Sequence, residues 1–327
     1  MEPLHDEGTP VSGTPASGTQ YSISSGSYHA TIASIGASIR SLTFEGRDLV
    51  VPFEADAVRP NFRGATLAPW PNRVIDGRYS FVGADQQLAH TEPERGHALH
   101  GLVAWLDFAP VESGDDHVVL SAVVVPQVGY PHRVRVDVRF ALDAAGLTQT
   151  ITATNIGSTA APYGCSAHPY LVAGPGLVDD WVLTLPASEV MLVTEDRLIP
   201  TGQASVADAL GGALDFRTAR TIGTTFIDHA FTNLPFPDPE TADARTTVTV
   251  TAAGGTGVSL SWDATCPWVQ VHTADRPEPE SNRVGLAVEP MTCPPDAFNS
   301  GDSVVTLEPG DTHAASWTIA AISALSA

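Results

Sequence analysis

Lysine is absent from this 327-residue chain, and all 16 of its basic residues are arginines. Without an amine side chain, the protein cannot form the Schiff base of a lysine-dependent aldolase or of a pyridoxal-phosphate enzyme. A P-loop nucleotide site is excluded as well, because that motif requires a lysine that reaches the phosphates. The missing residue type therefore removes three classes of enzyme.

Cysteines and long apolar runs are also scarce. The three cysteines, Cys165, Cys266 and Cys293, are odd in number and lack paired spacing, which fits a reducing compartment rather than a disulfide framework. No segment approaches the roughly 18 apolar residues of a membrane-spanning helix. Residues 1–18 lack the basic start and apolar run of a secretory signal. We therefore expect a cytoplasmic protein that does not enter a membrane.

Basic residues are outnumbered by acidic ones, 16 against 37, which gives a net charge of −21. Phosphate backbones and anionic membrane surfaces repel such a chain, so neither nucleic acid nor membrane is expected as a partner. The same charge also serves solubility. Hydrophobic residues make up 43% of the chain and charged residues 16%, a composition typical of a globular protein.

The chain shows one change in composition, near its start. Residues 1–20 are rich in Gly, Ser, Thr and Pro, and we predict a disordered tail there. Residues 21–327 contain no internal repeat and no further break. They are predicted to form a single domain, because large β-sandwiches exceed 200 residues as one unit.

Apolar residues recur with a period of two along most of the chain. In 133–142, valine, phenylalanine and leucine alternate with arginine and aspartate, the pattern of a strand with one wet face. The alternating runs 246–252 and 258–262 flank a Gly-rich loop and predict a hairpin. Convincing amphipathic helices are nearly absent, with one turn expected at 206–210. The predicted fold class is all-β, a large antiparallel β-sandwich.

Four segments place polar residues where a strand pattern does not require them: 68–73, 97–102, 164–171 and 288–298. In the last of these, alternation puts Gly285 and Ala287 on the same face as Glu289, which predicts a hollow beside the carboxylate. Pro290 is expected to end the strand, because it lacks an N–H group. Glu289 is thus predicted to be a carboxylate at a strand end, over a cleft; an exposed glutamate on a wet face is the alternative.

Histidines mark two of the other segments. His168 shares a predicted face with Gly164 and Ser166, and its imidazole can donate a proton near neutral pH. The alternative is a histidine bonded to a backbone carbonyl beside Pro169. His97 and His100 are three residues apart, but no carboxylate with metal-site spacing accompanies them, so no metal is predicted.

A fifth candidate surface lies on the predicted strand 268–272. Alternation places Trp268, Gln270 and His272 on one face. An aromatic ring beside hydrogen-bonding groups suits a sugar, which has apolar faces and a rim of hydroxyls. An ordinary half-exposed strand is the other interpretation.

Taken in order, these segments resemble the aldose 1-epimerase (mutarotase) family. The motifs that carry the resemblance are Asn72-Arg73, Gly77-Arg78-Tyr79, Leu99-His100-Gly101, Gly129-Tyr130-Pro131, His168-Pro169-Tyr170-Leu171, residues 228–232, Glu289, Asp296 and Asn299. They span about residues 21–320. The resemblance implies a β-supersandwich fold, a monosaccharide substrate and no metal or organic cofactor.

The resemblance also implies roles for individual residues. Glu289 corresponds to the general base and His168 to the general acid, while Arg73, His100 and Asp228 correspond to groups that hold the sugar. Gln270 joins them as a substrate-binding candidate on the sheet face described above.

Three departures point to a divergent bacterial branch of the family. Ala167 replaces the asparagine typical of galactose- and glucose-specific members, Leu102 replaces a glycine, and Pro290-Met291-Thr292 replaces a polar run. A galactose preference does not carry over.

The expected reaction is exchange between sugar anomers. A base removes the C1 hydroxyl proton, an acid protonates the ring oxygen, and the opened sugar recloses on its other face. A carboxylate of ordinary acidity is ionised at neutral pH, and a neighbouring anion would favour the protonated imidazole. Both groups are therefore expected to face one cleft.

Two other functions fit the same sequence. One is a non-catalytic carbohydrate-binding or sugar-sensing module. The other is an epimerase of hexose 6-phosphates, for which Arg59, Arg63 and Arg95 are the candidate cations, although the acidic charge balance favours a neutral sugar. A cupin-like metal enzyme would also be all-β, but this sequence lacks the spacing of metal ligands that such an enzyme requires. The protein is expected to be a monomer or a homodimer.

Overall fold

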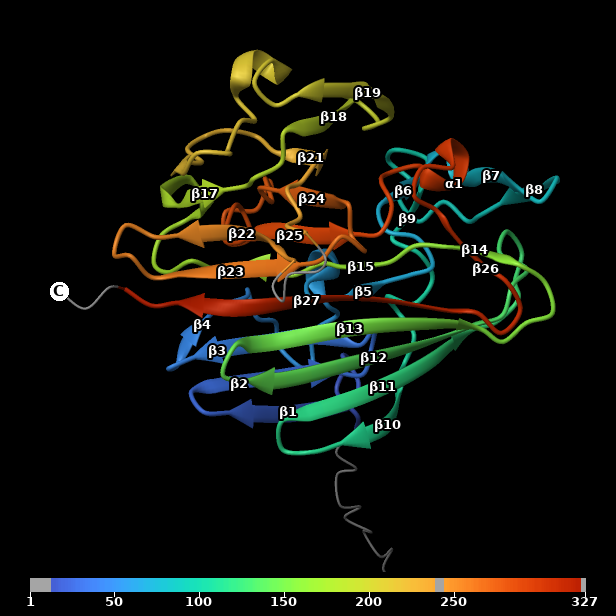
Figure 1. Ribbon diagram of the computed structural model, residues 1–327. Coiled ribbons are helices and arrows are strands. Elements are labelled where there is room, and N and C mark those ends of the chain that lie inside the picture. Colours follow the sequence, from blue (N-terminus) through green and yellow to red (C-terminus); the bar gives the residue numbers. More distant parts are fainter. Residues whose placement is uncertain (1–12, 239–243, 325–327) are drawn as a thin grey trace, which may run out of the picture.

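The computed structural model describes residues 13–238 and 244–324, and strands dominate this part of the chain. The largest sheet has nine strands in the order β10-β11-β12-β13-β27-β23-β22-β17-β20 (Figure 1). Their bounds are β10 Ala109–Ser113, β11 His117–Val124, β12 Val134–Asp143, β13 Gly146–Asn155, β27 Thr312–Ile322, β23 Gly257–Trp262, β22 Thr246–Thr251, β17 Val182–Thr184 and β20 Arg220–Thr221.

A six-stranded sheet contributes five of the residues that line the pocket described below. Its order is β16-β25-β24-β21-β18-β19, with β16 Tyr170–Leu171, β25 Leu286–Met291, β24 Trp268–His272, β21 Asp228–Thr232, β18 Glu189–Val193 and β19 Pro200–Ser205. A four-stranded sheet is formed by β1 Gln20–Ser25, β2 Tyr28–Ala33, β3 Ser38–Phe44 and β4 Arg47–Asp48. These sheets enclose one large cluster of buried apolar side chains, which includes Trp181, Trp262 and Trp317.

Four short ladders complete the strand pairing: β5 Thr66–Leu67 with β15 Ser166–Ala167, β6 Arg73–Val74 with β9 Ala98–Leu99, β7 Arg78–Phe81 with β8 Ala84–Gln87, and β14 Ala161–Tyr163 with β26 Val305–Leu307. Within the described ranges the only α-helix is the single turn α1, Ala297–Ser300. No described helix is long or apolar enough to cross a membrane. The predicted all-β class with antiparallel sheets is confirmed.

Alternation along the strands explains how the largest sheet forms. In β12 the side chains of Val134, Val136 and Val138 are fully buried while the intervening residues face outward. Burial of each such valine stabilises the fold by about 1.5–3 kcal/mol relative to exposure. The predicted hairpin is present, because β22 pairs with β23 from Thr246 opposite Trp262 to Thr251 opposite Gly257.

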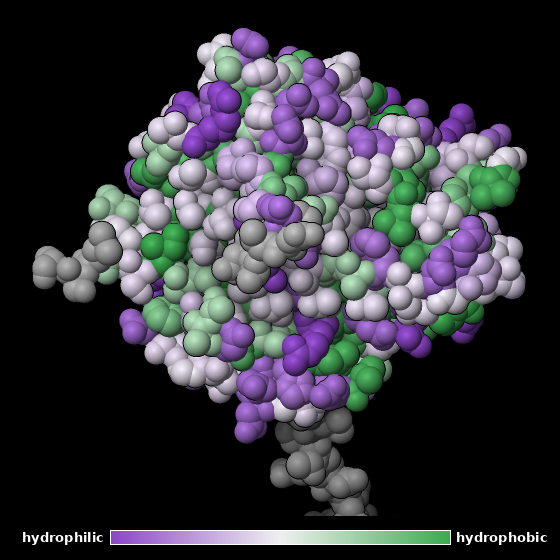
Figure 2. Space-filling view, viewed as in Figure 1, coloured by the Kyte–Doolittle hydropathy of each residue, from purple (hydrophilic) through white to green (hydrophobic). Residues whose placement is uncertain are grey.

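The surface of the molecule is mixed in character on the side shown in Figure 2. Hydrophilic and pale residues intersperse with small hydrophobic areas over this side. On β13 and β27, the outward residues include Thr148, Thr150 and Ser316, which are partly exposed. This is the wet face that the period-two pattern predicts.

The predicted tail overlaps the described chain only in part. Residues 1–12 lie outside the described residues. Ser17 is buried, and its hydroxyl donates a hydrogen bond to the carbonyl of Ala55 at 2.7 Å. Strand β1 begins at Gln20. The chain is therefore already packed against the folded body upstream of residue 21.

Pro290 does not end its strand, and the prediction that it would is wrong. Strand β25 runs through Met291, and Pro290 is paired with Val269 of β24. On the other side, β16 pairs with β25 only at Leu286 and Ala287. Because no ladder partner faces Pro290 from that side, the missing N–H costs the sheet nothing there.

Candidate functional site

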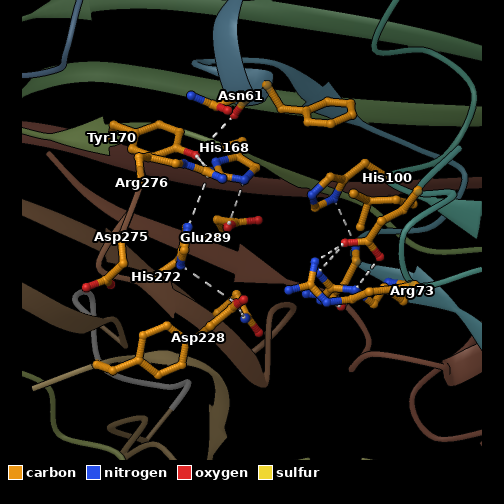
Figure 3. Close-up of a pocket in the computed structure, with 17 residues that line it drawn as sticks. Asn61, Arg73, His100, His168, Tyr170, Asp228, His272, Asp275, Arg276 and Glu289 are labelled. Atoms are coloured by element: carbon orange, nitrogen blue, oxygen red, sulfur yellow. Dashed lines mark hydrogen bonds and ion pairs between the residues drawn. The ribbon is translucent and has the colours of Figure 1, made fainter. Parts of the chain in front are cut away.

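The six residues predicted to form a site all line one cavity of about 240 Å³ (Figure 3). They are Arg73, His100, His168, Asp228, Gln270 and Glu289. Three neighbouring strands of the six-stranded sheet, β21, β24 and β25, contribute half of them. The register places Gln270 directly opposite Glu289, and Asp228 opposite His272. The sheet therefore delivers a compact group of polar side chains to one surface.

His168 lies between β15 and β16 and contacts Glu289. Its Nε2 is 3.3 Å from Oε1 of Glu289, and both side chains are almost fully buried. The imidazole ring stacks on Tyr170, with centroids 4.9 Å apart, and lies near-parallel to Phe62 at 6.4 Å. These aromatic rings fix the plane of the imidazole. A sugar would have to lie against this pair, because the two groups touch and leave no room between them.

The protonation of this pair differs from the expectation for separate groups. Burial lowers the pKa of His168 well below its ordinary value, and His100, His272 and Arg276 lower it further. Burial raises the pKa of Glu289 well above its ordinary value, and Asp228 adds to this while Arg73 opposes it. Burial therefore works against the ionised Glu289 that the sequence led us to expect, and it favours the neutral forms of both groups. The pair shares one proton.

Arg73 enters the pocket from β6 and is held by a buried carboxylate. Its Nε donates to Oε2 of Glu92 at 2.7 Å and its Nη2 to Oε1 at 2.9 Å. Burial alone would lower the pKa of Arg73, but Glu92, Asp228 and Glu289 outweigh it and raise that pKa. The guanidinium is thus a fixed cation at the pocket wall.

His100 presents a defined tautomer to the pocket. The backbone N–H of Asn72 donates to Nδ1 of His100 at 3.2 Å, so Nδ1 carries no proton. Burial lowers the pKa of His100 to about 3. The ring is therefore neutral at physiological pH with its proton on Nε2, and it offers one donor to a ligand.

Local backbone geometry explains the motifs around these two residues. Asn72 and His100 both have positive φ, 54° and 63°, and the Asn72 side chain accepts from the N–H of Arg73 at 2.9 Å. Gly101 follows with φ of 72°, and a Cβ there would lie 2.1 Å from the carbonyl oxygen of Ala68. Only glycine fits this close approach.

The opposite wall carries acceptors and a third histidine, His272. Nε2 of Gln270 donates to Oδ1 of Asp228 at 2.7 Å. Nδ1 of His272 lies 3.9 Å from the same oxygen, and Nη2 of Arg276 lies 3.4 Å from Nε2 of His272. Burial would raise the pKa of Asp228, but His272, Arg73 and Gln270 outweigh it and lower that pKa. Asp228 is therefore an ionised acceptor.

Several polar atoms of this pocket have no hydrogen-bond partner in the protein. These buried atoms are Nδ1 of His168, Nδ1 of His272, Oε1 of Gln270, Oε2 of Glu289, Nε of Arg95 and Nε of Arg276. Buried polar atoms are nearly always satisfied, so their concentration here indicates a polar ligand.

Some pocket residues were absent from the prediction. Glu92, Arg276 and Asp275 lie outside any alternating strand pattern, so no periodic signal marks them. His272 did carry a signal, since it shares a face of β24 with Gln270. Its place in the pocket follows directly from that face.

The candidate phosphate-binding arginines do not gather at the pocket. Arg59 is buried elsewhere and donates to the Ser38 hydroxyl. Arg63 does not line the pocket and donates to the carbonyl of Pro52 at 3.3 Å. Arg95 lines it but is paired with Glu92 at 2.9 Å.

His97 has a structural role beside the pocket. Its Nδ1 accepts from the N–H of Asp76 at 3.1 Å, and its Nε2 lies 3.0 Å from the carbonyl oxygen of Arg197. In the part of the chain that the structure describes, no three His, Cys, Asp or Glu side chains are arranged to hold a metal ion.

Comparison with known proteins identifies the family of the chain that forms this pocket. The sequence profile of the family described as aldose 1-epimerase matches residues 19–320. The uncharacterized protein YihR of Escherichia coli K12 is 40% identical over 294 residues, which cover 89% of this chain and 90% of that protein.

Solved structures agree in fold. The GalM/aldose epimerase homologue from C. elegans has a TM-score of 0.79 at 20% identity, with 93% of this chain and 99% of that chain covered. The galactose 1-epimerase from Lactobacillus acidophilus NCFM has a TM-score of 0.72 at 17% identity, covering 91% and 92%. Together with the family profile, which spans most of the sequence, these matches lead to one conclusion: the chain belongs to the aldose 1-epimerase family.

Proposed function

We propose that this protein interconverts the α and β anomers of a free aldohexose, with Glu289 as general base and His168 as general acid. The observation that supports this most directly is the contact of 3.3 Å between Nε2 of His168 and Oε1 of Glu289 in a pocket of unpartnered polar atoms. A proton donor and a proton acceptor that face one ligand are what anomer exchange requires.

The reaction balances within the pair. Glu289 takes the proton of the C1 hydroxyl while His168 gives its proton to the ring oxygen, and the C1–O5 bond breaks to leave an aldehyde. After rotation about C1–C2, the two transfers run in reverse and close the ring on its other face. Each positioned proton transfer contributes roughly 10²–10⁴ in rate.

The shared proton gives this cycle a simple starting point. Burial favours protonated Glu289 and neutral His168, which is the state that the pair also reaches when the ring has opened. The ring-opening step needs the other arrangement, with the proton on the imidazole. Sugar hydroxyls that donate to the carboxylate would stabilise that arrangement, in which Nε2 of His168 lies 3.3 Å from Oε1 of Glu289.

The remaining pocket residues would hold the sugar. Arg73 and the Nε2–H of His100 supply donors on one side, and Asp228 with Oε1 of Gln270 supplies acceptors on the other. Such a ring of donors and acceptors orients hydroxyls without a cofactor. We place the activity in the cytoplasm, which the three free, buried cysteines support.

Polarimetry of freshly dissolved α-glucose and α-galactose tests the proposal. We expect the protein to accelerate the approach to anomeric equilibrium, and Glu289→Gln and His168→Asn to lower turnover by at least roughly 10²-fold while remaining folded. Saturable sugar binding without acceleration would instead identify a carbohydrate-binding module. A Glu289→Gln protein with near-normal turnover would remove Glu289 from the mechanism.

A further inference from the structure

Glu92 is a buried carboxylate at the pocket wall that the proposed proton transfers do not use. Its side chain is 9% exposed and lies between two guanidinium groups. It accepts hydrogen bonds from Nε and Nη2 of Arg73 at 2.7 and 2.9 Å, and from Nη1 of Arg95 at 2.9 Å. Burying a carboxylate is costly unless it is fully paired. The burial of the Glu92 carboxylate beside Arg73 therefore indicates a specific role for this pair.

The pairing geometry leaves one end of Arg73 available. Glu92 occupies the edge of the guanidinium formed by Nε and Nη2. Nη1 has only a long contact of 3.4 Å with Oδ1 of Asn72. Because the guanidinium is planar, fixing one edge also fixes the direction of the remaining N–H groups. Glu92 thereby determines which donors Arg73 can offer to a ligand.

The segment that carries Glu92 is braced on its outer side. The backbone groups of Glu92 and His97 bond to each other and close the loop between them. Arg197, from the connection between β18 and β19, donates from Nε to the carbonyl of Arg95 at 2.9 Å. The carbonyl of Arg197 lies 3.0 Å from Nε2 of His97. The backbone that carries Glu92 is thus held in place independently of Arg73.

Charge links Glu92 to the catalytic pair through Arg73. The groups that act on Glu289 are Asp228, whose charge favours its protonated form, and Arg73, whose charge opposes that form, together with His168 in contact with it. Arg73 is in turn surrounded by Glu92, Asp228 and Glu289. Without Glu92, more of the charge of Arg73 would act on Glu289 and weaken its hold on the shared proton.

We propose that Glu92 is a positioning residue of this site, which orients the guanidinium of Arg73 and offsets part of its charge beside His168 and Glu289. The inference rests on the proposed anomer exchange, with Glu289 and His168 in the roles given above. Glu92 itself acts through Arg73 and transfers no proton.

The test compares Glu92→Gln, Glu92→Asp and wild type, measuring kcat and KM for α-glucose or α-galactose by polarimetry across pH. Glu94→Gln is the matched control, because Glu94 is an exposed acid in the same segment and does not line the pocket. Circular dichroism and thermal melting establish that each variant is folded. The wild type is measured first, so that a failure of the proposed activity is recognised before any variant is interpreted.

For Glu92→Gln we expect kcat/KM to fall roughly 10- to 100-fold, the cost of a catalytic group displaced by about 1 Å. The alkaline limb of its pH profile, where the pair loses its proton, should move to lower pH. Glu92→Asp keeps the charge and should leave that limb near its wild-type position while kcat/KM remains reduced. Glu94→Gln should match the wild type.

A purely structural role for Glu92 would lower activity without moving the alkaline limb, and that outcome overturns the proposal. So does a folded Glu92→Gln protein with the wild-type rate and profile. If Glu92→Gln does not fold, Glu92→Asp decides: wild-type kcat/KM in that variant contradicts the positioning role. An active wild type with unaffected variants rejects only this inference, whereas an inactive wild type rejects the proposed function.

Discussion

Oε1 of Glu289 lies 3.3 Å from Nε2 of His168, and the two groups hold one proton between them in a buried setting. The pH dependence of activity follows from this relationship. A second proton binds to the pair only well below the ordinary pKa of histidine, because burial lowers the pKa of His168. The shared proton leaves only well above the ordinary pKa of glutamate, because burial raises the pKa of Glu289.

We therefore predict that kcat/KM for anomer exchange stays constant as the pH falls from about 7 through the ordinary histidine pKa of about 6.5. The measurement is polarimetric kcat/KM over the range in which the protein remains folded. If kcat/KM fell to half of its maximum at a pH of about 6.5, His168 would titrate as an isolated, solvated histidine, and this prediction would be wrong.

Asp228→Asn should weaken sugar binding more than it slows the chemistry. Asp228 accepts from Gln270 at 2.7 Å and is the ionised acceptor on its side of the pocket. Loss of a charged hydrogen-bond acceptor costs about 1.5–3 kcal/mol, so we expect KM to rise by roughly tenfold or more. Initial rates over a series of sugar concentrations measure it. Asp208→Asn is the control, since Asp208 is exposed and outside the pocket; equal KM values for the two variants would contradict the role of Asp228.

Gly101→Ala should destabilise the fold by more than Gly83→Ala. Both glycines have positive φ, 72° and 75°. A Cβ at residue 101 would meet the carbonyl oxygen of Ala68 at 2.1 Å, whereas residue 83 has nothing within 4 Å. Gly83→Ala should therefore cost about 1–2 kcal/mol from backbone strain alone, and Gly101→Ala that amount plus the clash. Urea unfolding of both variants measures the free energy of unfolding. Equal decreases in that free energy would mean that the loop at residue 101 moves to accommodate the Cβ without further destabilisation.

Acidification should destabilise the protein, in part through His132. His132 is buried and packs edge-on against Phe81 and Tyr130, with ring centroids 5.7 and 4.9 Å apart. Burial lowers its pKa, so the unfolded chain binds a proton more readily than the folded chain does. Stability from this group is present above the unfolded pKa of about 6.5 and falls as the pH drops below it.

His132→Phe should consequently lose less stability than the wild type between about pH 7 and pH 5. Chemical unfolding at both pH values measures the difference. His29→Phe serves as the comparison, because His29 is exposed on β2. An identical loss for His132→Phe and the wild type would show that His132 does not contribute.

The strands could be predicted from the sequence because a sheet with one buried and one exposed face requires apolar and polar residues to alternate along each strand. Residues 133–142 show this alternation, and β12 covers Val134–Asp143. Pro290 was misjudged because the rule for proline assumes ladder partners on both sides of a strand, and here only β24 forms a ladder with it. Which sides of a strand are paired is a tertiary property that the local sequence does not contain.

The candidate site was predictable where residues occur in distinctive local motifs, and all six expected side chains line the pocket. Glu92 lacks such a motif. Its proposed role depends on its contact with Arg73, which is 19 positions away in the sequence. The protonation of Glu289 was misjudged for a related reason. The pKa of a carboxyl depends on burial and on distant neighbours such as Asp228, and alternation reports neither.

The pocket draws its residues from both ends of the chain. Arg73 and His100 come from the small β6–β9 ladder and its flank, whereas Asp228, Gln270 and Glu289 come from β21, β24 and β25. A polypeptide cut midway would leave Arg73 and His100 on one fragment and Asp228, Gln270 and Glu289 on the other. Turnover regained on mixing two such fragments would therefore report reassembly of the whole sandwich.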